Sequence, residues 1–234
     1  MSVVLVFLAA VGAVVAWWLS HQRLMAKPWL EVGAPDDLPG ARPSSLPAAT
    51  IGLGVLLAVV GSLFALLISA YLMRMHGADW SLPPAPKLLL LNTGVLILSS
   101  VALQAAQLAA YRGQIDNVRA GLVAAGISAL AFLVGQLLAW QQLSAAGYFA
   151  ATNPANAFFY LFTGLHGLHL LGGLVALALT ADKVWRGFEI GQVRLSVKLC
   201  AFYWHFLLLL WLVLFSLLTP WVDEFAVMCR QLLT

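Results

Sequence analysis

Three histidines and three glutamines are the residues of this sequence whose chemistry must be weighed first. They lie within long apolar runs: Gln104, Gln107, Gln136, His166, His169 and His205. His166 and His169 are three residues apart, so on a helix they project to roughly the same side. Two or more imidazoles that converge can bind haem or copper. A metal centre is therefore the first hypothesis that the sequence must support or exclude.

The elements that position these residues are predicted to be membrane helices. Of 234 residues, 62% are hydrophobic and 9% are charged, against about 45–50% and about 25% in a soluble domain, and the mean hydropathy is +0.94. Six apolar runs approach the length of about 20 residues that a spanning helix needs, and each must be helical because lipid offers the backbone no hydrogen bonds. The runs are Val3–Ser20, Ala48–Met73, Leu88–Tyr111, Ala120–Leu143, Asn156–Ala181 and Leu199–Pro220. We predict an all-α integral membrane protein, a bundle of six transmembrane helices.

These runs divide the chain into four segments. Residues 1–20 are predicted to form an N-terminal transmembrane helix, which we expect to be retained because no positive n-region precedes it and no clear cleavage site follows. Residues 21–47 contain five of the ten prolines and are predicted to be a cytoplasmic linker. Residues 48–220 form a five-helix core, and residues 221–234 a short exported tail.

The distribution of lysine and arginine predicts the orientation. The connections after the first, third and fifth runs carry nine cations: Arg23, Lys27, Arg42, Arg112, Arg119, Lys183, Arg186, Arg194 and Lys198. The opposite side carries three: Arg74, Lys87 and Arg230. Because basic loops stay in the cytoplasm, both termini are predicted to lie on the exported side of a bacterial inner membrane. The same residues are orientation signals and give no reason to expect a nucleic-acid partner.

The pattern of charge and cysteine argues against chemistry performed by this chain alone. None of the 12 Lys and Arg or nine Asp and Glu lies within a predicted span, which argues against a proton pump or an ion-coupled transporter. His166 and His169 fall in the outer half of one span, whereas His205 falls near the inner end of the next, so three ligands would not converge. Two cysteines exclude a disulfide framework or a thiolate-ligated cluster. We predict no cofactor or metal in this chain.

Three stretches resemble the subunit III family of haem–copper terminal oxidases. The first is SAY at 69–71, followed by Trp80 and by LNTGVLILSS at 91–100. The second is FFYLFTGLHGLH at 158–169, preceded by GQ at 135–136 and Trp140. The third is YWHF at 203–206 followed by Trp211. The family often carries a buried glutamate in the span that ends Ser-x-Tyr, and Val60 stands there instead.

The resemblance implies a non-catalytic subunit of an oxidoreductase complex, a five-helix subunit III core plus one N-terminal helix. The complex would take electrons from cytochrome c or quinol in the respiratory chain and reduce oxygen to water, coupled to proton translocation. Haem and copper would lie in partner subunits. The implied partners are the catalytic subunit I, subunit II, membrane phospholipid and a larger respiratory supercomplex. The implied roles are assembly, lipid binding and stability of subunit I.

Seven side chains are the candidates for binding lipid or a neighbouring subunit, as bulky or polar groups in spans without charge. They are Gln136, Trp140, His166, His169, Trp204, His205 and Trp211. Two other functions stay open on the sequence. One is a subunit III-like accessory protein of nitric oxide reductase, whose helices are similar. The other is a stand-alone small membrane transporter.

Overall fold

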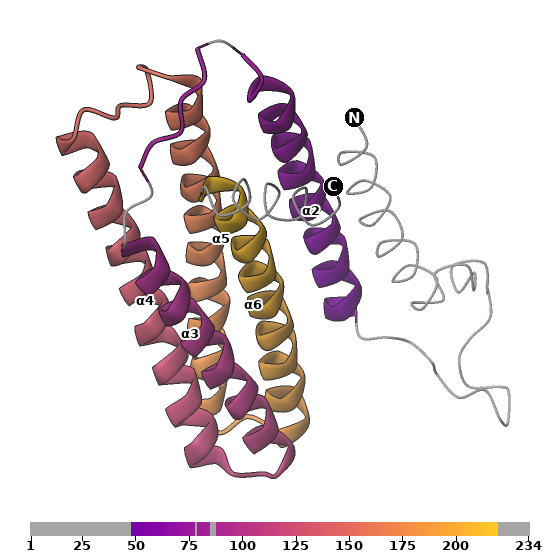
Figure 1. The fold of residues 1–234 in the computed structure, drawn as a ribbon. Coiled ribbons are helices and arrows are strands. Elements are labelled where there is room, and N and C mark those ends of the chain that lie inside the picture. Colours follow the sequence, from indigo (N-terminus) through magenta and orange to yellow (C-terminus); the bar gives the residue numbers. More distant parts are fainter. Residues whose placement is uncertain (1–47, 78, 85–87, 220–234) are drawn as a thin grey trace, which may run out of the picture. The chain divides into compact units, whose positions relative to one another are not determined.

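The computed structural model describes residues 48–77, 79–84 and 88–219. The predicted helix at 1–20, the linker at 21–47 and the tail at 221–234 lie outside the described residues. These described residues form five helices: α2 (Ala48–Arg74), α3 (Leu88–Tyr111), α4 (Ile115–Ala145), α5 (Pro154–Trp185) and α6 (Ile190–Leu218) (Figure 1). All five are long and apolar enough to cross a membrane. Five of the six predicted spans are thus confirmed.

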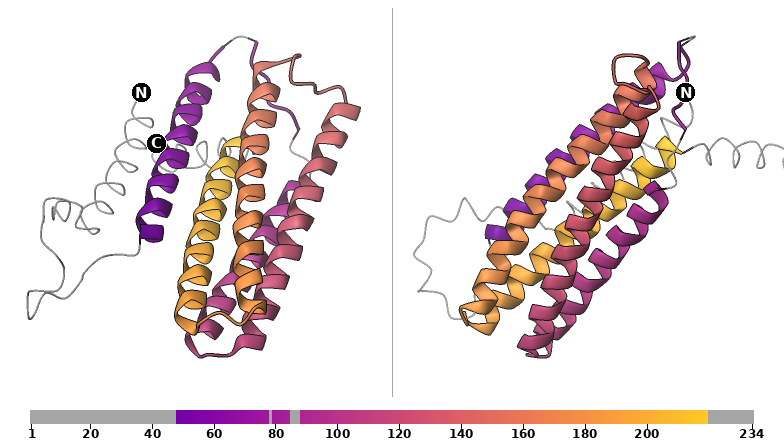
Figure 2. Two further views of the ribbon diagram at one scale, coloured as in Figure 1. Left: turned by 180° about the vertical axis from the view of Figure 1, so that it is seen from behind. Right: turned by 90° about the vertical axis from the view of Figure 1, so that its left-hand side faces the viewer.

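Helices α3 to α6 form a four-helix bundle. The chain divides into two units, Met1–Leu72 and Met73–Thr234, and the second contains the bundle. Helix α3 packs against α4 and α6, and α5 packs against the same two helices, so the four form a ring (Figures 1 and 2). Each helix runs antiparallel to its neighbours in the ring, because short loops join successive helices. The described part of the first unit is residues 48–72, which belong to the long apolar helix α2.

Three helices extend beyond the apolar runs that predict them. Helix α4 begins at Ile115 rather than Ala120, α5 ends at Trp185 rather than Ala181, and α6 begins at Ile190 rather than Leu199. An apolar run reports the length in contact with lipid, whereas helical hydrogen bonding continues into the polar flanks. There, Arg119 pairs with Asp116 at 3.3 Å and Arg186 with Asp182 at 2.8 Å, at helical spacing.

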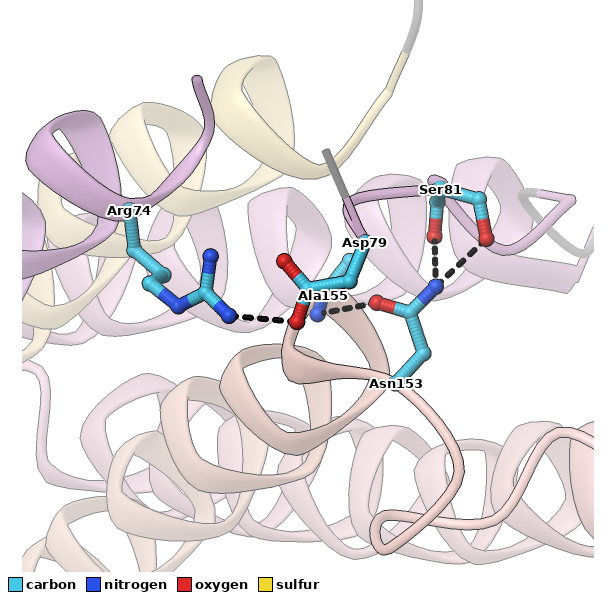
Figure 3. Close-up of polar contacts among 5 residues, drawn as sticks. All are labelled: Arg74, Asp79, Ser81, Asn153 and Ala155. Atoms are coloured by element: carbon cyan, nitrogen blue, oxygen red, sulfur yellow. Dashed lines mark hydrogen bonds and ion pairs between the residues drawn. The ribbon is translucent and has the colours of Figure 1, made fainter. Parts of the chain in front are cut away.

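Hydrogen bonds between loops fix the end of the bundle at which α5 begins. The Asn153 side chain accepts a bond from the Ala155 backbone N–H at 2.8 Å and so caps α5. Its amide nitrogen donates to the backbone oxygen of Ser81 at 3.0 Å and to the Ser81 hydroxyl. Nearby, the guanidinium of Arg74 pairs with Asp79 (Figure 3). The connection that leads into α3 is thereby tied to the start of α5.

Candidate functional site: the polar core of the helix bundle

One chain of hydrogen bonds joins three helices around Trp204. The indole N–H of Trp204, which is fully buried, donates to the Ser99 hydroxyl at 2.8 Å. That hydroxyl donates in turn to the backbone oxygen of Ala125 at 2.9 Å. Next to it, the Tyr203 hydroxyl donates to the backbone oxygen of His169 at 2.9 Å, which connects α6 with α5. We call this group of five residues the Trp204 layer, and it contains a side chain or backbone group from every helix of the bundle.

A glycine permits α5 to approach this layer closely. A Cβ atom on Gly173 would lie 2.9 Å from ring carbons of both Trp204 and Tyr203, whereas one on Gly172 would meet nothing within 4 Å. Small residues at helix interfaces let backbones approach and are characteristic of membrane bundles. The two rings of α6 therefore pack directly on the α5 backbone at Gly173.

His205 connects α6 to α3 at the edge of the bundle. Its Nδ1 forms a hydrogen bond with the Ser100 hydroxyl, and its Nε2 lies 2.9 Å from Oε1 of Gln104. Ser100 is buried, His205 is half-buried and Gln104 is exposed. Both ring nitrogens are thus occupied by α3. Polar bonds between helices stabilise membrane bundles by about 0.6–2 kcal/mol each. The two hydrogen bonds of His205 therefore stabilise the interface between α3 and α6.

A second polar group lies around Trp211, nearer the end at which α3 begins. The Trp211 indole N–H donates to the Thr93 hydroxyl at 3.0 Å, and that hydroxyl donates to the Leu89 backbone oxygen at 2.8 Å. The Phe132 ring packs edge-on against Trp211, with ring centroids 4.9 Å apart. The imidazole of His166 packs against both of these rings: its centroid lies 5.1 Å from that of Trp211 and 5.8 Å from that of Phe132.

Asn92 and Gln136 complete this second group. The Asn92 amide donates to the Phe132 backbone oxygen at 3.4 Å and to Oε1 of Gln136 at 3.5 Å. A Cβ on Gly135 would lie 2.0 Å from Oδ1 of Asn92. The Asn92 amide can therefore pack against the α4 backbone only because residue 135 is a glycine. We call Asn92, Thr93, Phe132, Gln136, His166 and Trp211 the Trp211 layer. Among the described residues, neither ring nitrogen of His166 nor Nε2 of Gln136 has a hydrogen-bond partner.

Trp140 joins α4 to α5 toward the same end of the bundle. Its indole N–H donates to the Thr163 hydroxyl at 3.0 Å, and its ring meets that of Tyr160 edge-on at 5.6 Å. A Cβ on Gly164 would make ordinary contact with the indole at 3.4 Å. Trp140 is half-buried, so one edge of the ring remains accessible from outside the bundle.

The end of the bundle at which α6 begins is closed by basic side chains. Arg194 donates from Nε to the Ala110 backbone oxygen at 3.0 Å and from an Nη to that of Tyr111 at 3.1 Å. These carbonyls belong to the last turn of α3, where helix carbonyls lack intrahelical donors. Lys183 donates to the Ser196 hydroxyl at 3.1 Å and links α5 to α6.

The predicted site residues divide into two groups by burial. Trp204, Trp211, His166 and Gln136 are buried in the bundle, and Trp140, His169 and His205 are half-buried. His166 and His169 differ in environment although they are three residues apart, because the ring of His169 turns back to bond the Leu165 backbone oxygen at 2.7 Å. Within residues 48–77, 79–84 and 88–219, no three His, Cys, Asp or Glu side chains come together as metal ligands would. Most of the predicted site residues instead form hydrogen bonds between helices.

Most of the residues that bond or pack against these side chains are not predicted from the sequence. Ser99, Thr93 and Ser100 accept or share the key bonds, and the Phe132 ring of α4 packs against His166. The available signal was a hydroxyl or amide residue in an otherwise apolar span. That signal is weak alone, because serine and threonine can bond their own helix backbone instead.

Fold and site together define a class: multi-pass α-helical membrane proteins whose intramembrane polar groups join helix to helix. Residues 80–223 match the family "Cytochrome c oxidase subunit III". A probable cytochrome c oxidase subunit 3 of Mycobacterium tuberculosis is 33% identical over 184 residues, which cover 76% of this chain and 88% of the relative. The cytochrome c oxidase subunit 3 of Thermostichus vulcanus is 30% identical over 177 residues, 72% of this chain and 85% of the relative. The chain therefore belongs to the cytochrome c oxidase subunit III family, and the resemblance seen in its motifs is confirmed.

Proposed function

We propose that this chain is the non-catalytic subunit III of an aerobic respiratory oxidase and that it supports assembly, lipid binding and stability of subunit I. The complex would reduce oxygen to water coupled to proton translocation, with haem and copper held by its partners, subunits I and II. The observation that carries the proposal is the use of the intramembrane polar groups. Trp204, Trp211, Trp140 and His205 each bond a side chain of another helix. Groups engaged in this way give a rigid bundle.

Rigidity is what makes such a bundle a useful support. In lipid, no hydrophobic driving force favours helix association over lipid contact, so packing and polar bonds decide it. A partner that docks on a preformed face loses less conformational freedom than one that orders a mobile face. The aromatic and polar layers fix the spacing of α3 to α6, and that spacing determines the surface that subunit I and phospholipid meet.

The two burial groups would serve this role in different ways. The buried residues Trp204, Trp211, His166 and Gln136 would act through the helix spacing that they set. The half-buried residues Trp140, His169 and His205 would contact phospholipid or subunit I directly. An indole and an imidazole suit this role, because the bonds of the polar edge hold the ring in place while its exposed part offers contact area.

The proposed location is a bacterial inner membrane, with the basic end of the bundle in the cytoplasm. Arg112, Arg194 and Lys183 lie where α3 and α5 end and α6 begins, which is the end that the charge distribution assigns to the cytoplasm. Cations at that surface would also attract anionic lipid head groups.

The names of the relatives favour an oxygen-reducing complex over a nitric oxide reductase, since the relatives described above are called subunits of cytochrome c oxidase. The apolar character of all five described spans does not favour a stand-alone transporter. Purification of the complex and measurement of oxygen and nitric oxide consumption would distinguish the first two functions.

Removal of the chain is the primary experiment. An oxidase prepared without it should retain its haem spectrum and initial rate of oxygen consumption, and should lose activity sooner during sustained turnover. Loss of the haem or copper signal from a subunit I that is still present in full amount would mean that this chain holds part of the catalytic centre. A lifetime equal to that of the complete complex would show that it gives no support.

A substitution tests the half-buried group separately. His169→Phe should lower the amount of chain that co-purifies with subunit I, or the phospholipid retained, because the ring loses the bond to the Leu165 backbone oxygen that orients it at the bundle surface. Leu168→Phe is the matched control, since Leu168 is the adjacent residue and is 62% exposed. Equal co-purification, lipid content and lifetime in both variants would contradict the role given to His169.

A further inference from the structure

The Trp211 layer contains polar atoms that the bundle itself does not satisfy. The His166 side chain is 0% exposed and Gln136 is 4% exposed. Both ring nitrogens of His166 and Nε2 of Gln136 lack a hydrogen-bond partner in the described part of the chain. A buried polar group left without a partner destabilises the fold, because it has lost its bonds to water and gained none. Within a membrane, lipid cannot supply the missing bond.

These atoms lie at one level of the bundle. The bond from Trp140 to Thr163 fixes the register of the antiparallel pair α4 and α5. From that bond, one turn back along α4 reaches Gln136, and three residues forward along α5 reach His166. Gln136 is also one turn from Phe132, whose ring is 5.8 Å from that of His166. The carboxamide and the imidazole therefore lie across the same helix interface, and the Phe132 and Trp211 rings pack against the imidazole.

The hydrogen-bonding capacities of the two groups define the ligand that would satisfy them. A neutral imidazole has one donor and one acceptor, and the free carboxamide nitrogen has two donors. A ligand must therefore both accept and donate, and it must be small. No charged side chain belongs to this layer, so an ion would leave its charge uncompensated in a medium of low dielectric. Water meets each of these requirements, and buried waters have about three polar partners.

We propose that the Trp211 layer is a binding site for one buried water molecule, which bridges the carboxamide of Gln136 and the imidazole of His166. The water accepts a hydrogen bond from Nε2 of Gln136 and donates one to the unprotonated ring nitrogen of His166. It connects α4 to α5 in the way that the Ser99 hydroxyl connects α6 to α4.

The direct test is density for this water in the intact oxidase complex. Cryo-electron microscopy, at a resolution where other internal waters are visible, should show a peak within hydrogen-bond distance of both Gln136 and His166. Gln136→Leu should abolish the peak, and His169→Phe, the control on the same helix as His166, should leave it. The proposal is overturned if no peak appears beside His166 while other buried waters are resolved, or if the peak persists in Gln136→Leu.

A double-mutant cycle gives an independent test. The thermal unfolding midpoint would be measured for Gln136→Leu, His166→Phe and the double variant. If one water bridges the two side chains, the double variant should lower the midpoint by less than the two single shifts combined, because either change alone removes the bridge. Additive shifts would overturn the bridge. Gln136→Leu with His169→Phe is the control pair and should be additive.

Discussion

The Trp204 layer and the Trp211 layer have the same arrangement but differ in how many of their buried polar atoms have hydrogen-bond partners. Each places an α6 indole in the centre of the bundle, and each indole donates to an α3 hydroxyl, Ser99 in one case and Thr93 in the other. Around Trp204 the chain of bonds continues to α4. Around Trp211 it does not, and Gln136 and His166 keep unpartnered polar atoms within the described residues.

The two α3 hydroxyls also donate in different directions. Ser99 donates across the interface to the Ala125 backbone oxygen, so its bond holds α3 to α4. Thr93 donates to the Leu89 backbone oxygen four residues earlier in its own helix, as a threonine in a helix commonly does. An indole can therefore be satisfied in both layers while only one layer is closed. A hydrogen bond from the central indole therefore does not show whether the other polar atoms of its layer have partners.

Loss of the Trp204 side chain should have the largest effect on the free energy of unfolding. Trp204→Ala removes a fully buried indole and should lower the free energy of unfolding by about 3–5 kcal/mol, through lost contacts and the cavity left behind. Trp211→Ala should cost less than Trp204→Ala, because water can enter a layer that already has unpartnered polar atoms. Denaturant titration of the purified chain in mild detergent would measure both. A larger cost for Trp211→Ala would reverse the proposed difference between the layers.

A methyl group at the close contact between α5 and α6 should have the next largest effect. Gly173→Ala would place a Cβ 2.9 Å from the Trp204 and Tyr203 rings, and neither ring can move freely in a packed core. We expect a cost of about 1–3 kcal/mol from overpacking. Gly172→Ala is the matched control: it meets nothing within 4 Å and should be neutral or stabilising by up to about 1 kcal/mol. Equal unfolding midpoints for the two variants would show that α5 does not rest on these rings.

The two hydroxyls provide the sharpest comparison between the layers. Ser99→Ala leaves the Trp204 indole N–H buried without an acceptor and should cost about 1–3 kcal/mol. Thr93→Val removes the acceptor of Trp211 at nearly constant volume and should cost less than Ser99→Ala, since the water proposed for this layer can accept from the indole N–H instead. Tryptophan fluorescence of each variant would report whether the indole gains contact with water. A Thr93→Val cost equal to that of Ser99→Ala would argue against hydration of the Trp211 layer.

The helices were largely predictable from the sequence, and the reason is physical. Lipid requires an apolar helix of nearly fixed length, so hydropathy predicts Leu88–Tyr111 with the bounds that α3 has. It fails at the ends of α4, α5 and α6, because polar residues there continue the helix outside the hydrocarbon region. Asp116 and Arg119 form an ion pair in the first turns of α4, a local signal that a hydropathy window does not detect.

The candidate site was predictable by residue but not by contact. Trp204, Trp211 and His166 were selected as unusual groups in apolar spans, and all three lie in the core. Their partners on α3 were not predicted, because pairing depends on the register between helices that are distant in sequence. Ser99 meets Trp204 across 105 positions of the chain, and periodicity within one helix contains no information about that register.

The smallest effect is expected at the end of the bundle nearer the Trp211 layer, from the exposed pair of Arg74 and Asp79. The hydrogen bond from the Arg74 guanidinium lowers the pKa of the Asp79 carboxyl below its ordinary value of 3.8. A carboxyl with a lowered pKa in the folded chain contributes stability above its ordinary pKa, and loses it as the pH falls through the lower folded value. Asp79→Asn should therefore lower the unfolding midpoint slightly and equally at pH 7 and pH 5, because exposed pairs are screened by solvent. Below about pH 4 the variant and the parent chain should converge. A difference that grows between pH 7 and pH 5 would mean that another group titrates together with the pair.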